Sequence, residues 1–287
     1  MPNPDTQHFH DAASGTLSYV ISDPVTSKAA VVDPLLGFCM ASGRTDRGLV
    51  DAICNYLASR KLQLEWILET HAHADHLSAA QVLKARLGGK VGIGEGICSV
   101  QENFAGLFNL KAPFCCDGSQ FDRLFAANDP FAIGSLSGRV LATPGHTSDS
   151  VTYVVGNAAF IGDTLFMPDV GTARCDFPGG DAGLLYDSIQ SLLSLPPDTL
   201  LYLCHDYPPD GRDMRYRCSI DEQRASNMHI GGGRSKREFI SLRQARDRTL
   251  SPPALILPAI QVNIRAGNVP EHEDNAVSYL KIPLNRF

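Results

Sequence analysis

Short apolar runs and amphipathic stretches alternate along the first part of the chain. Residues 16–21, 29–32 and 64–68 have the length and composition of β-strands. Apolar residues four or five positions apart predict one helix between residues 49 and 62, and residues 77–87 continue as a second helix up to Gly88-Gly89. This alternation is compatible with an α/β fold, although it does not establish one by itself.

The middle of the chain contains further short strands. They are predicted at 90–93, 139–142, 151–155, 158–161 and 200–203. The dipeptide Gly156-Asn157 forms a two-residue hairpin turn between two of them. An amphipathic helix is predicted over residues 183–195, where two prolines end it. Residues 94–137 have weak periodicity, which indicates a mixture of helix and loop.

From residue 212 onwards the chain changes character. Residues 212–248 contain ten Lys or Arg against five Asp or Glu, in a protein whose formal net charge is −6. Two helical stretches are predicted there, on either side of the triple glycine at 231–233. Solvated helix faces account for most of these charges, although their field would also favour an anionic substrate. The tail beyond them is apolar, with a β-like run at 260–264 and a further run at 277–282, so it is expected to pack on the body.

Candidate metal ligands lie where predicted strands end. The strand at 64–68 leads into four metal-capable side chains within six positions, which are His71, His73, Asp75 and His76. Similar residues follow later strands, at His146, Asp163 and His205. If these groups were buried without partners they would cost several kcal/mol, and a divalent cation removes that cost by coordination. The pattern therefore predicts a metal site on loops held by a sheet, rather than a polar loop that is only rich in histidine.

Composition and charge narrow the class of protein. The 287 residues are 44% hydrophobic and 20% charged, as in a globular protein with a full core. The acidic net charge argues against nonspecific binding to nucleic acid or to an anionic membrane. We find neither an apolar run of membrane-spanning length nor a signal peptide, so a cytoplasmic location is expected. The eight cysteines form no CxxC pair, and reduced thiols are expected.

The order of the candidate ligands resembles the metallo-β-lactamase superfamily. The motif HxHxDH at 71–76, followed by His146, Asp163 and His205, carries this resemblance. It implies an α/β fold of the αββα sandwich type, with the metal site along one edge of two sheets. We expect a single such domain over residues 1–287, with a C-terminal extension from about residue 212. In two-metal members one site would use His71, His73, His146 and Asp163, and the other Asp75, His76, Asp163 and His205.

The segment after Asp163 resembles the persulfide dioxygenase (sulfur dioxygenase) family in particular. The matching residues are those at 163–166, 171–177, Gly180 and 205–207. The tail, including residues 226–236, is similar to a longer bacterial branch that also contains β-lactamase-like hydrolases. One position departs from the family pattern: Thr172 stands where other members have a cysteine in a Gly-Cys-Gly-Arg run. Any role of that cysteine does not carry over.

This resemblance implies oxidation of glutathione persulfide by O₂ to sulfite and glutathione. A single Fe(II) per chain would be held by His71, His146 and Asp163, although such ligands also accept Zn or Mn. Two histidines and one carboxylate leave coordination positions free for O₂ and a substrate sulfur. His73, Asp75, His76 and His205 would support these ligands or hold a second metal.

Two residues are candidates for substrate binding. Arg174 would pair with a carboxylate of glutathione, unless it forms an internal ion pair with Asp176 or Asp169. Tyr207 would reach the substrate, unless it is a rim aromatic that packs on the tail. The expected partners are glutathione persulfide and O₂, with no nucleic acid and no membrane, while homodimerisation stays open.

Two rival functions remain in view. A glyoxalase II-type enzyme would use two metals and an activated hydroxide to hydrolyse a thioester of glutathione. A non-catalytic module would use the histidine cluster only to hold the fold together. Structural zinc sites have four closed ligands and are often rich in cysteine, whereas this cluster has more ligands than closure needs.

Overall fold

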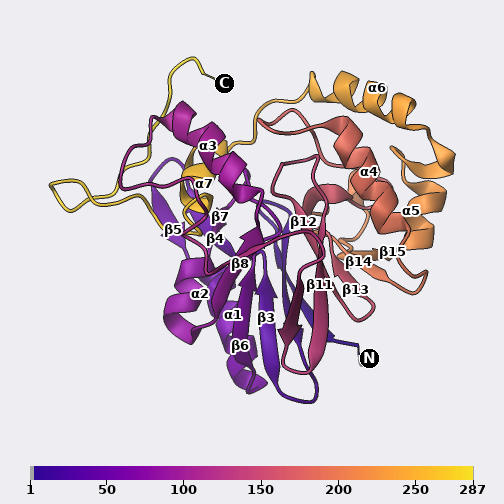
Figure 1. Ribbon diagram of the computed structural model, residues 1–287, viewed down its shortest axis with the longest axis horizontal. Coiled ribbons are helices and arrows are strands. Elements are labelled where there is room, and N and C mark those ends of the chain that lie inside the picture. Colours follow the sequence, from indigo (N-terminus) through magenta and orange to yellow (C-terminus); the bar gives the residue numbers. More distant parts are fainter. Residues whose placement is uncertain (1–2, 287) are drawn as a thin grey trace.

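The protein is described here by a computed structural model, which covers residues 3–286 and is built around two six-stranded sheets (Figure 1). The first sheet contains, in spatial order, β1 (Asp5–Asp11), β2 (Thr16–Ser22), β3 (Lys28–Val32), β6 (Gln63–Leu68), β8 (Lys90–Gly94) and β9 (Arg123–Phe125). The second contains β10 (Pro130–Ile133), β11 (Leu136–Ala142), β12 (Val151–Val155), β13 (Ala158–Phe160), β14 (Leu200–Tyr202) and β15 (Arg217–Ser219). A small third sheet joins β5 (Arg44–Asp46), β4 (Leu35–Cys39) and β7 (Leu77–Ser78).

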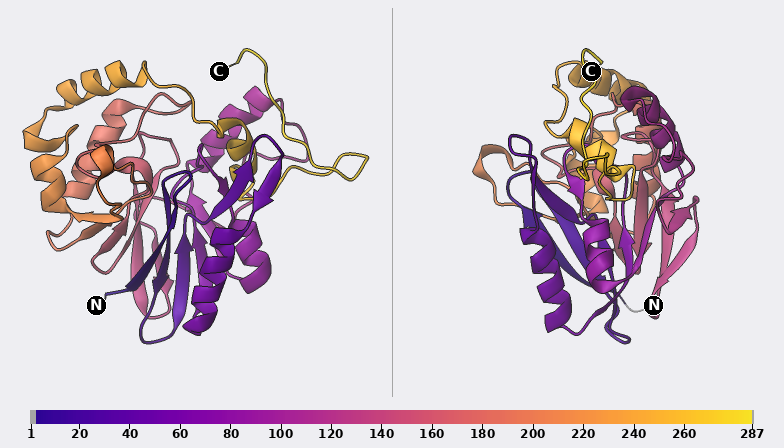
Figure 2. Two further views of the ribbon diagram at one scale, coloured as in Figure 1. Left: turned by 180° about the vertical axis from the view of Figure 1, so that it is seen from behind. Right: turned by 90° about the vertical axis from the view of Figure 1, so that its left-hand side faces the viewer.

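Helices cover the outer face of each large sheet (Figures 1 and 2). On the first sheet lie α1 (Gly48–Ser59), α2 (Ala80–Leu87), α3 (Ile97–Phe108) and α7 (Ile256–Asn263). On the second lie α4 (Ala182–Leu193), α5 (Ile220–Ser226) and α6 (Lys236–Asp247). Single 3₁₀ turns occur at η1 (Gly162–Thr164), η2 (Pro209–Gly211) and η3 (Gly231–Gly233). The predicted αββα sandwich is confirmed.

The alternation of side chains along each strand explains these layers. In β2, Tyr19 and Ile21 point into the core between the sheets, whereas Val20 packs in the core under the helices. In β12, Tyr153 lies between the sheets and Val154 faces the helices of the other side. Successive residues of a strand face opposite sides, so a strand buried on both faces is apolar throughout. This is why the predicted strands appear in the sequence as unbroken apolar runs.

Two elements and one packing expectation differ from the sequence-based prediction. The helix predicted from residue 77 begins only at Ala80, because residues 77–78 pair with β4 as a short strand. The strand predicted at 260–264 is wrong: this segment belongs to α7, whose Ile256, Ala259 and Ile260 lie at helical spacing against the first core. The run at 277–282, which was expected to pack on the body, is largely exposed.

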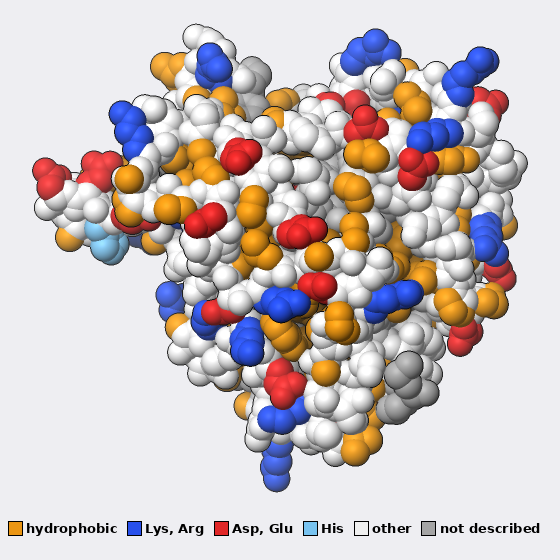
Figure 3. Space-filling view, viewed as in Figure 1, with side chains coloured by type: hydrophobic (Ala, Val, Ile, Leu, Met, Phe, Trp, Pro, Cys, Tyr) orange, Lys and Arg blue, Asp and Glu red, His pale blue; other side chains and the backbone are white. Residues whose placement is uncertain are grey.

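The expected packing of the tail is confirmed as far as Ala266, which is buried with α7 in the first core. The division of the chain near residue 212 stays a prediction. Within residues 3–286, no helix is both long enough and apolar enough to span a membrane. On the face drawn in Figure 3, acidic and basic side chains are interspersed, so this face carries no continuous basic surface of the kind that binds nucleic acid.

Candidate metal centre

Four loops bring the predicted ligands together. His71, His73, Asp75 and His76 lie in the loop after β6, His146 lies between β11 and β12, Asp163 lies in η1 after β13, and His205 follows β14. The nitrogen and oxygen atoms offered by His71, His146 and Asp163 all lie within 4.8 Å of one another. A second group, within the same distance, joins His73, Asp75 and His76. Residues up to 134 positions apart in the chain, from His71 to His205, thus form one cluster, in which every member except the half-buried Asp75 is buried.

Asp163 is the residue that links the two halves of this cluster. Its Oδ2 lies 3.6 Å from His146 Nε2 and 3.9 Å from His71 Nε2. Its Oδ1 lies 3.5 Å from His205 Nε2, and that nitrogen is 3.3 Å from Asp75 Oδ2. One carboxylate therefore faces both groups of ligands, with one oxygen toward each.

Hydrogen bonds fix the orientation of three imidazoles. The Thr70 hydroxyl donates to Asp33 Oδ2 at 2.8 Å, so it accepts from His71 Nδ1 at 3.0 Å. His73 Nε2 lies 3.0 Å from Asp33 Oδ1 and donates to it. His146 Nδ1 donates to the carbonyl of Arg174 at 2.7 Å. Each bond leaves one ring nitrogen with a lone pair for a metal. The acceptor behind the ring, which is a hydroxyl for His71, a carboxylate for His73 and a carbonyl for His146, fixes the tautomer.

Several buried polar atoms of this cluster have no hydrogen-bond partner among residues 3–286. They include His71 Nε2, His73 Nδ1, both ring nitrogens of His76, Asp163 Oδ1 and His205 Nε2. Buried polar groups normally find a hydrogen-bond partner, so several orphans in one cluster require an explanation. The donor set of imidazole nitrogens and carboxylate oxygens fits a divalent transition metal.

The protonation states are also suitable for metal binding. Burial, reinforced by the neighbouring imidazole of His73, lowers the pKa of His71 well below its usual value. Burial and His76 do the same to the pKa of His73. Burial opposes ionisation of Asp75, but His205 and His76 together hold its pKa well below the usual range. Neutral imidazole and ionised carboxylate are the forms that coordinate a metal.

A glycine makes room for this arrangement. Gly162, at the start of η1, has a φ of +52° and lies against Thr70 and His71. A Cβ at this position would come within 2.7 Å of Thr70 Oγ1. Any other residue would be strained there and would push Thr70 away from His71.

Two buried acids behind the histidines carry no signal of their role in the sequence. Asp33 directly follows the strand predicted at 29–32, yet it is 2% exposed and accepts from both the backbone N–H and the hydroxyl of Thr70. Glu69 is buried beside it, and burial together with the charge of Asp33 raises the pKa of Glu69 well above its usual value. Their burial could not be deduced from local pattern, because acidic residues after a strand usually lie in solvent.

One cysteine also lies at the cluster. Cys204 offers its sulfur within 4.8 Å of ligand atoms of His73 and His205. Its Sγ is 3.7 Å from Asp33 Oδ2, to which the thiol donates. Burial and the charge of Asp33 raise the pKa of Cys204 well above its usual value. All eight cysteines are free.

Asn263, at the end of α7, clamps the ligand loop from the C-terminal side. Its side-chain amide donates to the carbonyls of His73 and His76, both at 2.8 Å. Its Oδ1 accepts from Ser78 N at 2.7 Å. The residue is 4% exposed, so these bonds have no competition from water. The sequence placed this residue in a strand, and only the tertiary structure reveals its contact with the ligands.

Replacement of Asn263 by Leu is expected to weaken metal binding about 10- to 100-fold, because the carbonyls of two ligand residues lose their donors and the loop loosens. The measurement is metal affinity by competition with a chelator. Asn268→Leu is the control, since Asn268 bonds only to Arg265 nearby. Equal metal affinity in the Asn263→Leu variant and in the native protein would contradict the clamp.

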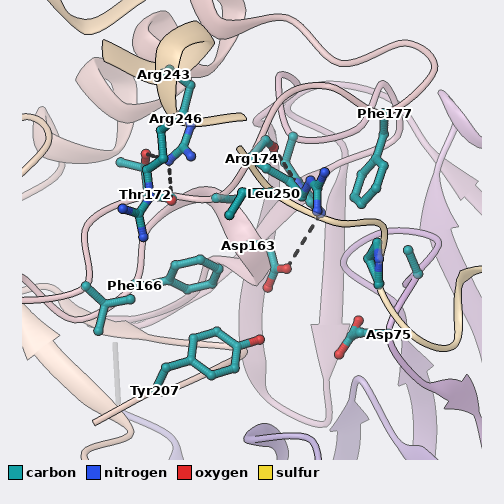
Figure 4. Close-up of a pocket in the computed structure, with 15 residues that line it drawn as sticks. Asp75, Asp163, Phe166, Thr172, Arg174, Phe177, Tyr207, Arg243, Arg246 and Leu250 are labelled. Carbon is teal, nitrogen blue, oxygen red and sulfur yellow. Dashed lines mark hydrogen bonds and ion pairs between the residues drawn. The ribbon is translucent and has the colours of Figure 1, made fainter. Parts of the chain in front are cut away.

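A pocket of about 270 Å³ opens onto the cluster (Figure 4). Asp163, His146 and Asp75 form its floor. The walls are largely apolar and consist of Ala74, Phe166, Val170, Ala173, Phe177, Leu250 and Pro253. The remaining lining residues are Thr172, Arg174, Tyr207, Arg243 and Arg246. A mostly apolar pocket with a few polar groups and convergent ligands is typical of a small-molecule site.

The two predicted substrate residues both line this pocket. Arg174 forms the internal pair that the sequence left open: Nε and Nη2 donate to the two oxygens of Asp176 at 2.6 and 2.7 Å, and Nη1 donates to Ser251 O at 2.7 Å. Its charge is therefore neutralised within the protein. Tyr207 stacks on His205 with 5.5 Å between ring centroids and is 47% exposed, so it forms part of the rim beside the metal ligands.

A buried network holds the loop at 171–175 against α6. Arg243, which is 1% exposed, pairs with Asp247 and donates to Thr172 O at 3.0 Å. Asp247 in turn accepts from Cys175 N at 3.0 Å. His229 Nδ1 accepts from Thr172 N at 2.9 Å. Thr172 thus helps to pack the loop against the C-terminal helices, through its contacts with Arg243 and His229.

The comparisons with known proteins agree with this geometry. Residues 13–205 match the family model described as the Metallo-beta-lactamase superfamily. Two relatives are each 50% identical: a probable metallo-hydrolase of Burkholderia pseudomallei, over 96% of this chain and 98% of that protein, and glyoxylase B2 of Dictyostelium discoideum, over 96% of each. The chain spans only 65% of a beta-lactamase hydrolase-like protein of Agrobacterium fabrum, at 51% identity and 98% coverage of this chain.

Proteins named persulfide dioxygenase are more distant relatives. Human persulfide dioxygenase ETHE1 is 27% identical over 91% of this chain and 88% of its own length. The crystal structure of ETHE1 from Myxococcus xanthus superposes with a TM-score of 0.73 at 31% identity, over 92% of this chain and all of that one. Both the family model and the 50% identical relatives span well over half of this sequence. The chain therefore belongs to the metallo-beta-lactamase superfamily.

Proposed function

We propose that this protein is a glutathione-dependent persulfide dioxygenase with one Fe(II) per chain. The observation that carries the proposal is the compact group of His71, His146 and Asp163, in which two imidazoles and one carboxylate converge within 4.8 Å and His73 is not included. Such a triad, when it holds iron, leaves positions free for both O₂ and a sulfur ligand and allows electrons to pass between them.

The overall reaction balances without a further reductant. Glutathione persulfide, O₂ and water give glutathione, sulfite and two protons. The S–S bond breaks, the terminal sulfur loses four electrons, and O₂ gains four. Two oxygen atoms of sulfite come from O₂ and the third comes from water.

The protein's own residues would orient this chemistry. His205 lies beside both Asp163 and Asp75, where it can hold water and accept a proton that is released. Phe166, Phe177 and Leu250 line the pocket and keep bulk water from the sulfur. The likeness to proteins named persulfide dioxygenase supports the proposal, as does the ETHE1 structure at 31% identity.

The test uses protein loaded with iron under anaerobic conditions. We expect about one iron per chain and, on addition of glutathione persulfide and air-saturated buffer, one O₂ consumed for each sulfite formed. O₂ uptake is followed with an electrode and sulfite by chromatography. If the iron-loaded protein consumes no O₂ when glutathione persulfide is added, the proposal is wrong.

A glyoxalase II-type thioester hydrolase is the second candidate. It is favoured by the unpartnered nitrogens of His73, His76 and His205, which could hold a second metal, and by a relative named glyoxylase B2. In that case about two zinc ions per chain and rapid hydrolysis of S-lactoylglutathione are expected. The same iron- and zinc-loaded samples, assayed on both substrates, discriminate the two functions.

A further inference from the structure

Of the three arginines that line the metal pocket, two are already neutralised. Arg174 is paired in bidentate fashion with Asp176, and Arg243 is paired with Asp247. The third, Arg246, is exposed and has no acidic or hydrogen-bonding partner for its guanidinium among residues 3–286. Only Arg246 can therefore offer its full charge to an anion inside this pocket.

The helix α6 directs Arg246 toward the pocket. Arg243 is locked into the body by Asp247 and Thr172, which fixes the rotation of the helix. Arg246 follows three residues later and so lies on nearly the same side of the helix. Figure 4 shows Arg243 and Arg246 together on one side of the pocket and Asp163 in its centre. The free cation and the metal ligands thus belong to one cavity.

The rest of the basic segment offers no equivalent. Five of its ten cations pair with acids, namely Arg212, Arg215, Arg224, Lys236 and Arg243. Of the others, Arg217 stacks against Tyr202 and Tyr216. Arg234, Arg237 and Arg248 do not line this pocket. Of the ten cations in this basic segment, Arg246 is therefore the one that both lines the pocket and lacks an acidic partner among residues 3–286.

We propose that Arg246 is the specificity-determining residue that binds a carboxylate of the glutathione portion of the substrate. This inference rests on the proposed function for the class of substrate, but not on the oxidation step. The pocket has metal ligands at its floor, apolar walls and a free guanidinium, a combination that suits a ligand with sulfur at one end and a carboxylate at the other. Arg174, held by Asp176, instead positions the loop and the carbonyl that orients His146.

The test compares Arg246→Gln with Arg237→Gln. Both residues are exposed on α6, and they lie nine positions apart, which is two and a half turns and hence opposite faces. The two variants change the net charge equally. In the metal-loaded protein, titration calorimetry with S-methylglutathione is expected to give about tenfold weaker binding for Arg246→Gln and less than a twofold change for Arg237→Gln.

Substrate analogues then identify the interaction. One analogue is amidated at the glycine carboxylate and the other lacks the α-carboxylate of the γ-glutamyl residue. For one of the two, native protein is expected to bind about tenfold more weakly, and Arg246→Gln to show no further loss. With glutathione persulfide, the KM of Arg246→Gln should rise about tenfold at unchanged kcat, because the contact is made equally in ground and transition states.

Each negative outcome has a distinct meaning. Equal weakening in Arg246→Gln and Arg237→Gln, or a loss in Arg246→Gln that persists with both analogues, overturns the role of Arg246. Because S-methylglutathione cannot be oxidised as a persulfide, its binding is independent of dioxygenase activity. O₂ uptake that is absent while Arg246→Gln still weakens binding would refute the dioxygenase and leave this inference standing.

Discussion

Asp163→Asn is expected to abolish metal binding and to reduce activity at least about 1,000-fold, while the protein stays folded. One carboxylate faces both groups of ligands, with Oδ2 toward His71 and His146 and Oδ1 toward His205. An amide has nearly the same shape but lacks the charge that balances a divalent cation. A bound metal stabilises the transition state by several kcal/mol, and losing that stabilisation lowers activity about 1,000-fold.

The measurements are metal content, activity and the unfolding midpoint. The variant should be compared with metal-free native protein, because a bound metal stabilises the native state by mass action. Asp169→Asn is the matched control, since Asp169 is an exposed acid whose partner Arg212 keeps a second carboxylate at Asp206. If Asp163→Asn unfolds while the metal-free native protein does not, Asp163 has a structural role, as the non-catalytic alternative requires.

Asp33→Ala is expected to lower the free energy of unfolding by about 3–5 kcal/mol, the largest effect on stability that the site predicts. Asp33 accepts from Thr70 N at 2.7 Å, from the Thr70 hydroxyl at 2.8 Å and from His73 Nε2 at 3.0 Å. All these donors are buried and would lose their partner. The positive φ of Asp33, +49°, adds strain for alanine.

Urea unfolding of the metal-free proteins measures this effect without the contribution of the metal. Asp33→Asn is the matched variant, because asparagine keeps one acceptor oxygen and tolerates positive φ, so its loss should be smaller. Metal affinity should also fall in Asp33→Ala, since His73 and Thr70 lose the group that orients them. A loss below about 1 kcal/mol in Asp33→Ala would show that water replaces the carboxylate, contrary to the burial of this site.

The sequence predicted the candidate ligands and their order because each lies directly after an apolar strand. His71, His146, Asp163 and His205 carry this signal locally, in residue type and in position. The strands themselves were predictable for the same reason, since burial on both faces makes them apolar throughout. The error at 260–264 arose because a short apolar run fits a strand and a buried helix equally well, and tertiary packing decides between them.

By itself, then, the sequence determined most of the strands and the set of candidate ligands, since both depend on periodicity and residue type. The αββα architecture was implied by the resemblance that the ordered ligand motif carries. Only the tertiary structure decided which of them form the compact triad, that Asp33 and Asn263 orient the ligand loop, and that Arg174 is neutralised while Arg246 is free. These are contacts between residues far apart in the chain. Their energies depend on burial and on distances of a few ångströms, and neither quantity is present in local pattern.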